Sequence, residues 1–189
     1  MISMNLRLVF GGEMDQQQTD NATTDVTSVN AGTAEGHLRV RLFSAHDIEK
    51  GRLLMQQHHD STLFHGEELS HVKLDQHFKL ILSRPSNMIG IIAERNGEAD
   101  GLAWASVSEY ILTEKSRIVS INLIAVDLNL TPLRRAKVFI ALVSAVKQWS
   151  ASVGAGYLFL HVTTGYRIKE TDRLVRALGG RGIGGSYIL

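Results

Sequence analysis

A chain of 189 residues, 44% of them hydrophobic, is long enough for one domain with a buried core. It has no cysteine, which excludes disulfides and thiolate metal sites and predicts a reducing, cytoplasmic setting. The longest strongly apolar run, VFIALVSAV, is far shorter than the roughly 18 residues that cross a bilayer. The first twelve residues also lack a secretion signal, so we expect no membrane partner.

Charge is unevenly spread along the chain, although its formal net charge is only +1. Residues 1–36 carry one basic side chain against five acidic ones, and residues 131–189 carry nine Lys or Arg against two acids. A basic C-terminal third suits an anionic ligand, either a cofactor phosphate or a nucleic acid, unless it is only a solvated basic face. Nucleic-acid binding is not expected, because Trp104 and Trp149 are not interleaved with basic residues.

Residues 1–36 are predicted to form an N-terminal arm, separate from a main domain over residues 37–189. Ile2–Phe10 alternates apolar and polar side chains, which predicts a strand with one face to bury. The polar, acidic segment that follows shows neither helical nor strand periodicity. The strand therefore either adds to a sheet edge of a partner chain, including a second copy, or folds back on its own domain.

From residue 37 the pattern predicts strands alternating with helices, hence an α/β domain with a mixed sheet. Pro85 ends the second helix, and Asn96-Gly97 is a typical hairpin turn. In chain order we expect a strand at 38–44, helices at 45–59 and 73–84, a hairpin at 88–110, a long strand at 116–130, a helix from 131, a strand at 156–165, a helix at 170–180 and a short strand at 186–189.

The helix after the long strand has a well-marked beginning. Thr131 is a good N-cap, and Pro132 suits the first helical position. An apolar stripe follows at helical spacing and predicts the face that packs on the sheet. Its members are Phe139, Leu142, Val143, Val146, Trp149 and Val153.

Four stretches, in this order of elements, resemble the GNAT superfamily of N-acetyltransferases over about residues 37–189. They are HHDSTLF at 58–64, LNLTPLRRAK at 128–137, WSASVGAGYLFLHVTTG at 149–165 and LVRALGGRGIGGSYIL at 174–189. The resemblance is closest to small GNAT-like proteins encoded by bacteriophages. It implies a central mixed sheet with two splayed strands, flanked by helices.

The resemblance also implies a place for acetyl-CoA. In this superfamily the pantetheine arm pairs with the first splayed strand, and the pyrophosphate lies at the next helix N-terminus, where the helix dipole favours an anion. Carried over, Leu128, Asn129 and Leu130 pair with pantetheine. The residues that face the pyrophosphate are Arg134, Arg135, Ala136, Lys137 and Val138.

The pyrophosphate segment departs from the family pattern. Ala136-Lys137 replaces a glycine pair, and Val138 and Ile140 stand where the pattern has small residues. Glycine permits close approach of a phosphate to the backbone, whereas β-branched side chains crowd it. Lys137 and the arginines compensate by charge-assisted contacts.

Acetyl transfer to an amine needs a base and a proton donor for the thiolate. Asp127, on the long strand, and His161, on the next strand beside Phe159 and Thr163, are the candidate bases, unless neighbours simply satisfy them. The family's usual donor, a tyrosine one turn before a Leu-Gly step, is replaced by Val175, which leaves Tyr166 or Tyr187.

The loop after the first helix supplies the substrate side in the family, and here it holds His58, Asp60 and Ser61. Five histidines fall between residues 58 and 77, but their spacing gives poor metal geometry, so no metal is expected.

Two functions fit these residues. The first is an acetyl-CoA-dependent N-acetyltransferase that acts on a primary amine of a small molecule or protein in the cytoplasm. The second is a non-catalytic GNAT-shaped interaction or structural protein, such as a phage virion or assembly component.

Overall fold

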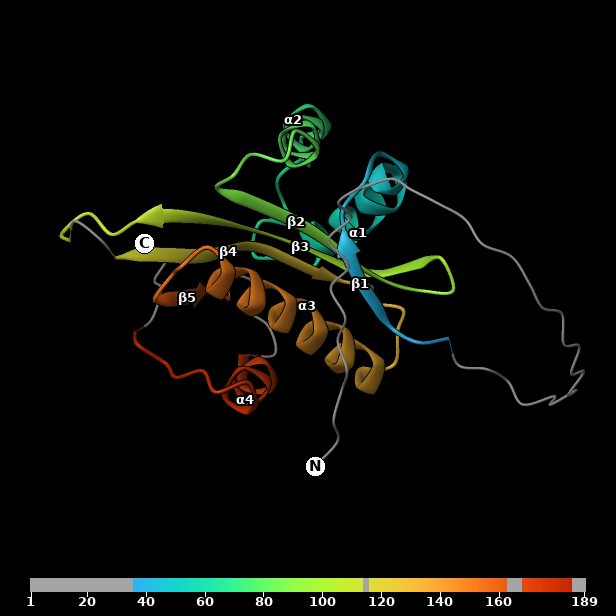
Figure 1. Cartoon of the computed structure of the whole chain (residues 1–189). Helices are drawn as coiled ribbons and strands as arrows, with labels where there is room; N and C mark the ends of the chain where they lie inside the picture. The colour runs from blue at the N-terminus through green and yellow to red at the C-terminus, as the bar shows by residue number, and fades with distance from the viewer. Residues whose placement is uncertain (1–35, 114–115, 163–167, 185–189) are drawn as a thin grey trace, which may run out of the picture.

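The computed structural model describes residues 36–113, 116–162 and 168–184, and Figure 1 shows their arrangement. The predicted arm strand Ile2–Phe10, the terminal strand at 186–189 and the candidate donors Tyr166 and Tyr187 lie outside the described residues. The elements are β1 Arg39–Leu42, η1 Ala45–Asp47, α1 Ile48–Asp60, α2 His71–Leu82, β2 Met88–Arg95, β3 Glu98–Glu109, β4 Arg117–Val126, α3 Pro132–Ser152, β5 Tyr157–Leu160 and α4 Ile168–Ala177.

In the described part of the chain, a five-stranded mixed sheet in the order β1-β2-β3-β4-β5 forms the centre of the domain. Neighbouring strands from β1 to β4 are antiparallel, and β5 runs parallel to β4 after the α3 crossover. Helices α1 and α2 cover one face, while α3 and α4 lie on the other (Figure 1). The α/β fold class predicted from the sequence is confirmed.

No helix in the described part of the chain combines the length and the apolar run that crossing a bilayer requires.

Each face of the sheet has its own apolar core. Under α3, the predicted stripe packs on Val119 and Ile121 of β4, and Leu142 and Val146 are fully buried. On the opposite face, Phe78 of α2 stacks on Phe43 with ring centroids 5.2 Å apart. Because both faces are covered, the central strands read as nearly continuous apolar runs.

The hairpin turn, the start of α3 and the glycines after α4 are confirmed, whereas α2 and α4 each begin two residues before the predicted start and end earlier than predicted. Asn96 and Gly97 both have positive φ, 53° and 79°, which is the two-residue hairpin geometry that matches strand twist. The Thr131 hydroxyl accepts a hydrogen bond from the Arg134 N–H (3.4 Å), and Pro132 opens α3. After α4, Gly179 adopts φ 84° and the Gly180 N–H donates to the Val175 carbonyl (2.9 Å).

Strand β4 contains a bulge that the sequence pattern did not predict. Trp104 of β3 lies opposite Leu123, but Ala105 lies opposite Ile121, which leaves Asn122 as an extra residue. The alternation of side chains therefore shifts at this point. Ile121 and Ile124 both pack toward α3, whereas Leu123 packs toward α1 and α2.

Candidate functional site

Strands β4 and β5, the last two strands of the sheet, stop pairing partway along β4, and a fork opens there. Their parallel register runs from Ile118 opposite Tyr157 to Ile121 opposite Leu160. Beyond that pair β4 continues to Val126, while β5 ends at Leu160. Residues 122–126 of β4 therefore have no β5 partner on that side. A cavity of about 210 Å³ lies at this fork.

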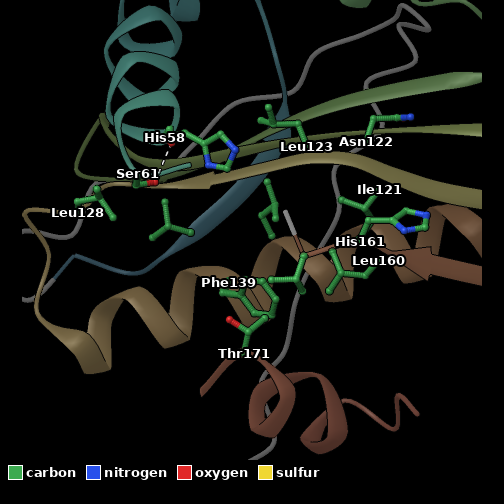
Figure 2. A pocket seen from close by; sticks show the side chains of 13 residues that line it. His58, Ser61, Ile121, Asn122, Leu123, Leu128, Phe139, Leu160, His161 and Thr171 are labelled. Carbon is green, nitrogen blue, oxygen red and sulfur yellow. Dashed lines mark hydrogen bonds between the residues drawn. The ribbon is translucent and has the colours of Figure 1, made fainter. Parts of the chain in front are cut away.

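The cavity draws its lining from both faces of the sheet (Figure 2). His58 and Ser61 come from the end of α1, and Phe139 and Thr171 come from α3 and α4. The two strands and the segments after them complete the wall. These residues are Ile121, Asn122, Leu123, Ile124, Val126, Leu128, Leu160, His161 and Val162.

His58 presents its imidazole to the cavity from the last turn of α1. The Ser61 hydroxyl donates to the His58 carbonyl (2.7 Å), which closes the helix end beside the cavity. Burial, and secondarily the charge of His59, lower the pKa of His58 below its ordinary value of 6.5. The ring is therefore neutral at pH 7 and able to accept a proton.

His161 also lines the cavity, from the segment immediately after β5. It is exposed and follows the strand instead of lying within it, because β5 ends at Leu160. The strand predicted over residues 156–165 is therefore too long, because residues 161 and 162 already lie outside β5. The imidazoles of His58 and His161, which are far apart in the sequence, thus line the same cavity.

Asp127, the other candidate base, does not lie on a strand and does not line the cavity. Its carboxylate accepts the Asn129 N–H (2.9 Å), and its own N–H donates to the Asp100 carbonyl (2.9 Å). This side-chain-to-backbone contact ends β4 at Val126 and starts a turn. The prediction of a strand that continues to residue 130 was wrong for this reason.

The same turn engages the backbone N–H groups of the residues predicted to pair with pantetheine. The Leu128 N–H donates to the Gln57 side-chain oxygen (3.1 Å), and the Leu130 N–H donates to the Asp127 carbonyl (3.3 Å). With Asn129 bonded to Asp127, all three backbone donors predicted to pair with pantetheine have acceptors within the protein. The strand edge left open at the fork is instead residues 122–126 of β4.

The beginning of α3 carries the basic residues predicted to face the pyrophosphate. Arg134 and Arg135 are half-buried, and Lys137 is exposed. The Nε of Arg134 is buried and has no hydrogen-bond partner among the described residues. An anion placed here would give this donor an acceptor, since a buried unsatisfied donor costs free energy.

Val138 does not face the helix N-terminus as predicted. Its side chain is fully buried in the core beneath the sheet, beside Gly101 of β3. The β-branched side chain therefore lies away from any phosphate at the start of α3. Ala136, one of the glycine replacements, is half-buried one turn after the N-cap.

Of the predicted substrate-side residues, His58 and Ser61 line the cavity, and Asp60 does not. Asp60 is exposed, and its carboxylate accepts a hydrogen bond from Gln56 (2.8 Å). The described residues contain no cluster of three His, Asp or Glu side chains that could hold a metal ion.

Several lining residues were not predicted from the sequence, notably Asn122, Leu123, Phe139 and Thr171. The sequence pattern predicts Phe139 only as a member of the apolar stripe on α3. Asn122 enters the site because of the bulge, where the Ser106 hydroxyl donates to its side-chain oxygen (2.9 Å). The sequence signal that could have identified Asn122 is the presence of a polar residue inside an apolar strand.

The fold is that of known acetyltransferases. The aminoglycoside N-acetyltransferase AAC(6')-Iy, solved with CoA, has a TM-score of 0.64 and 20% identity, with 84% of this chain and 97% of that chain covered. AAC(6')-Ih from Acinetobacter baumannii gives 0.60 and 16%, over 81% and 97% of the two chains. A transcriptional regulator from Bacillus halodurans C-125 gives 0.66 and 16%, over 81% and 99%. No protein-family model and no curated protein sequence matches the chain. At these identities the likeness establishes the GNAT fold.

Proposed function

We propose that the protein is an N-acetyltransferase that moves the acetyl group of acetyl-CoA to a primary amine. The observation that carries the proposal is the fork between β4 and β5, which opens beyond Ile121 and Leu160 into a cavity lined by two imidazoles. The presence of CoA in a solved neighbour of the same fold supports the choice of donor. Fold alone does not fix function, so the proposal rests on these side chains.

The residues present fit acetyl-CoA in two places. Residues 122–126 offer an open strand edge beside which an extended pantetheine arm can lie. Arg134 and Arg135 stand at the start of α3, where the helix dipole favours a pyrophosphate and the Arg134 Nε needs an acceptor. We propose that the arginines replace the contacts that glycines give in related proteins.

In the reaction, the acceptor nitrogen forms a bond to the acetyl carbon while the carbon–sulfur bond of the thioester breaks. The amine loses one proton and the departing CoA thiolate takes one up, so charge and atoms balance. We assign the proton acceptor to His58, because its neutral ring lies against the cavity wall. His161 borders the same cavity and is the alternative base.

The proposal is tested by melting the protein with acetyl-CoA, using adenosine diphosphate as the control ligand. Acetyl-CoA at 100 times its dissociation constant should stabilise the fold by about 2.7 kcal/mol. For a chain of this length that corresponds to roughly 5–10 °C in Tm. An unchanged Tm at millimolar acetyl-CoA contradicts the proposal.

A second candidate function is a non-catalytic interaction protein of the GNAT fold, for example a phage particle component. Two observations favour it. The backbone donors of Leu128, Asn129 and Leu130 are already satisfied within the chain. At the far end of β3, Ile111 and Leu112 are 91% and 77% exposed, as at a protein contact. Absence of acetyl-CoA binding would favour this second function.

A further inference from the structure

The proposed acetyl transfer does not specify which class of amine accepts the acetyl group. The geometry of the cavity points to one class, and this inference rests on the proposed function. We propose that the acceptor is a small monoamine with an apolar body, and that polycationic amines are excluded. The relevant feature is the chemistry of the cavity wall at the end of α1.

The wall of the cavity is largely apolar, and no Asp, Glu, Lys or Arg side chain of the described residues lines it. Leu123, Ile124, Leu128 and Val162 contribute aliphatic surface, and the polar groups are imidazole, hydroxyl and amide groups. Among the described residues, no carboxylate lines the cavity. A second ammonium group bound there would lose its water without gaining a counter-ion, which is costly.

Four carboxylates lie next to lining residues in the sequence, and none of them lines the cavity. Three have partners: Asp60 accepts from Gln56 (2.8 Å), Asp127 accepts from the Asn129 N–H (2.9 Å), and Asp172 pairs with Arg176 (2.7 Å). The fourth, Glu170, precedes Thr171 in the chain and is exposed. Even the carboxylates that adjoin lining residues in the sequence are therefore not part of the cavity wall.

Exposed apolar side chains occur in the loop after Ser61, outside the cavity lining, and on the lining residue Leu128. Leu63 and Phe64 follow Ser61 by two and three residues, and they are 55% and 54% exposed. Leu128, which itself lines the cavity, is 45% exposed. An apolar acceptor body would cover such side chains and gain free energy in proportion to the area removed from water.

The size of the cavity limits the acceptor, which would share the space with the pantetheine arm proposed to lie along residues 122–126. Its volume of about 210 Å³ is below the roughly 300–1,000 Å³ typical of sites for drug-sized ligands. An apolar wall also lowers the pKa of a bound ammonium, since burial disfavours the charged form. The ammonium gives one proton to the base and becomes a neutral amine that can attack; the nitrogen loses a second proton as the carbon–sulfur bond breaks, and the CoA thiolate takes up one proton.

A matched pair of amines tests this class directly. Hexylamine and 1,6-diaminohexane have the same chain, and only the second carries another ammonium group. CoA release can be followed with a thiol-reactive dye without protein background, because the chain has no cysteine. We expect kcat/KM for hexylamine to exceed that for the diamine by at least about 100-fold.

Two variants of equal size probe the wall itself. Leu123→Asp places a carboxylate on the lining, and Leu123→Asn is its neutral control. We expect the diamine-to-hexylamine ratio of kcat/KM to be at least about 10-fold higher in Leu123→Asp than in Leu123→Asn. If both variants fail to fold, the comparison of the two amines on the unaltered protein still decides.

Titration of acetyl-CoA into the same protein preparation distinguishes failure of the proposed function from failure of the proposed acceptor class. Without acetyl-CoA binding, the proposed function fails and the acceptor class falls with it. If acetyl-CoA binds but the diamine is used as well as hexylamine, or neither amine releases CoA, the acceptor class alone is overturned.

Discussion

Ile121 of β4 and Leu160 of β5 are the last residues that face each other in the parallel register of the two strands. One residue later, β4 bulges at Asn122 and β5 ends. A cavity that reaches from α1 to α4 opens at this point. The proposed chemistry depends on this separation, because the open edge of β4 and two imidazoles line the same cavity there.

Arg135→Ala should weaken acetyl-CoA binding by about 1.5–3 kcal/mol, the range for a hydrogen bond to a charged group. Isothermal titration with acetyl-CoA measures this loss. Arg173→Ala, an exposed arginine of α4 that does not line the cavity, is the matched control and should leave the affinity unchanged. Equal affinities for both variants would show that the phosphates lie elsewhere.

His58→Gln should lower kcat about 10²–10⁴-fold if His58 is the general base. His161→Gln should have a smaller effect, because that ring is exposed whereas His58 is half-buried at the cavity. Steady-state rates with hexylamine compare the two variants. His71→Gln, at the start of α2 and away from the cavity, serves as a control. A larger loss for His161→Gln would reverse the assignment.

The lowered pKa of His58 makes stability depend on pH. In the unfolded chain the imidazole titrates near 6.5, and in the folded chain it titrates below that value. Between these two pKa values the unfolded state binds more protons, so the free energy of unfolding falls as pH is lowered through this window. Urea titrations from pH 7.5 to 5 should show a fall that is reduced in His58→Gln; an identical fall in both proteins contradicts the effect.

Asp47→Asn should destabilise the fold by about 1.5–3 kcal/mol, because a charged hydrogen-bond acceptor is lost. Asp47 is buried and accepts from Arg41 at 2.6 and 2.8 Å, and from the Ser44 hydroxyl at 2.7 Å. Burial alone would raise the pKa of Asp47, but these bonds outweigh it and lower the pKa below 3.8.

The stabilisation from Asp47 is therefore present above its ordinary pKa and is lost as pH falls through the folded-state pKa. Urea denaturation at pH 7 gives the magnitude of the loss in Asp47→Asn. Glu98→Gln, at an exposed ion pair of 3.5 Å, is the control and should change stability little. Similar losses in the two variants would contradict the role of the buried network.

Gly101→Ala should destabilise the protein by about 1–3 kcal/mol through overpacking. A Cβ atom at this position would lie 2.8 Å from both the Ala125 carbonyl and a Val138 methyl group. Gly66→Ala is the matched control, since nothing lies within 4 Å of a Cβ there. Thermal melts compare the two, and equal Tm values would contradict the close approach of α3 to β3.

Much of the fold could be predicted because its signals are local. The hairpin at Asn96-Gly97, the start of α3 at Thr131-Pro132 and the glycines after α4 each depend on backbone preferences of a few neighbouring residues. The stripe on α3 was likewise readable from spacing, and its central members are buried as expected.

The site was predicted only in part, because its geometry depends on contacts that are distant in the sequence. The sequence predicts His58 on the substrate side and His161 as a base. It does not predict that both line one cavity, because no local pattern relates two residues so far apart. The sequence pattern predicts Asp127 to be a strand residue, but its carboxylate accepts the Asn129 N–H and ends the strand.

The alternation of elements, the turns and the apolar faces follow from side-chain size, polarity and local hydrogen bonding, so they can be derived from the sequence. Which β4 residues keep an open edge depends instead on how the elements pack together. The bulge at Asn122 depends on how β4 pairs with β3, and the bond from the Leu128 N–H to Gln57 depends on how α1 packs beside β4. Both are long-range pairings, whose partners no local pattern specifies.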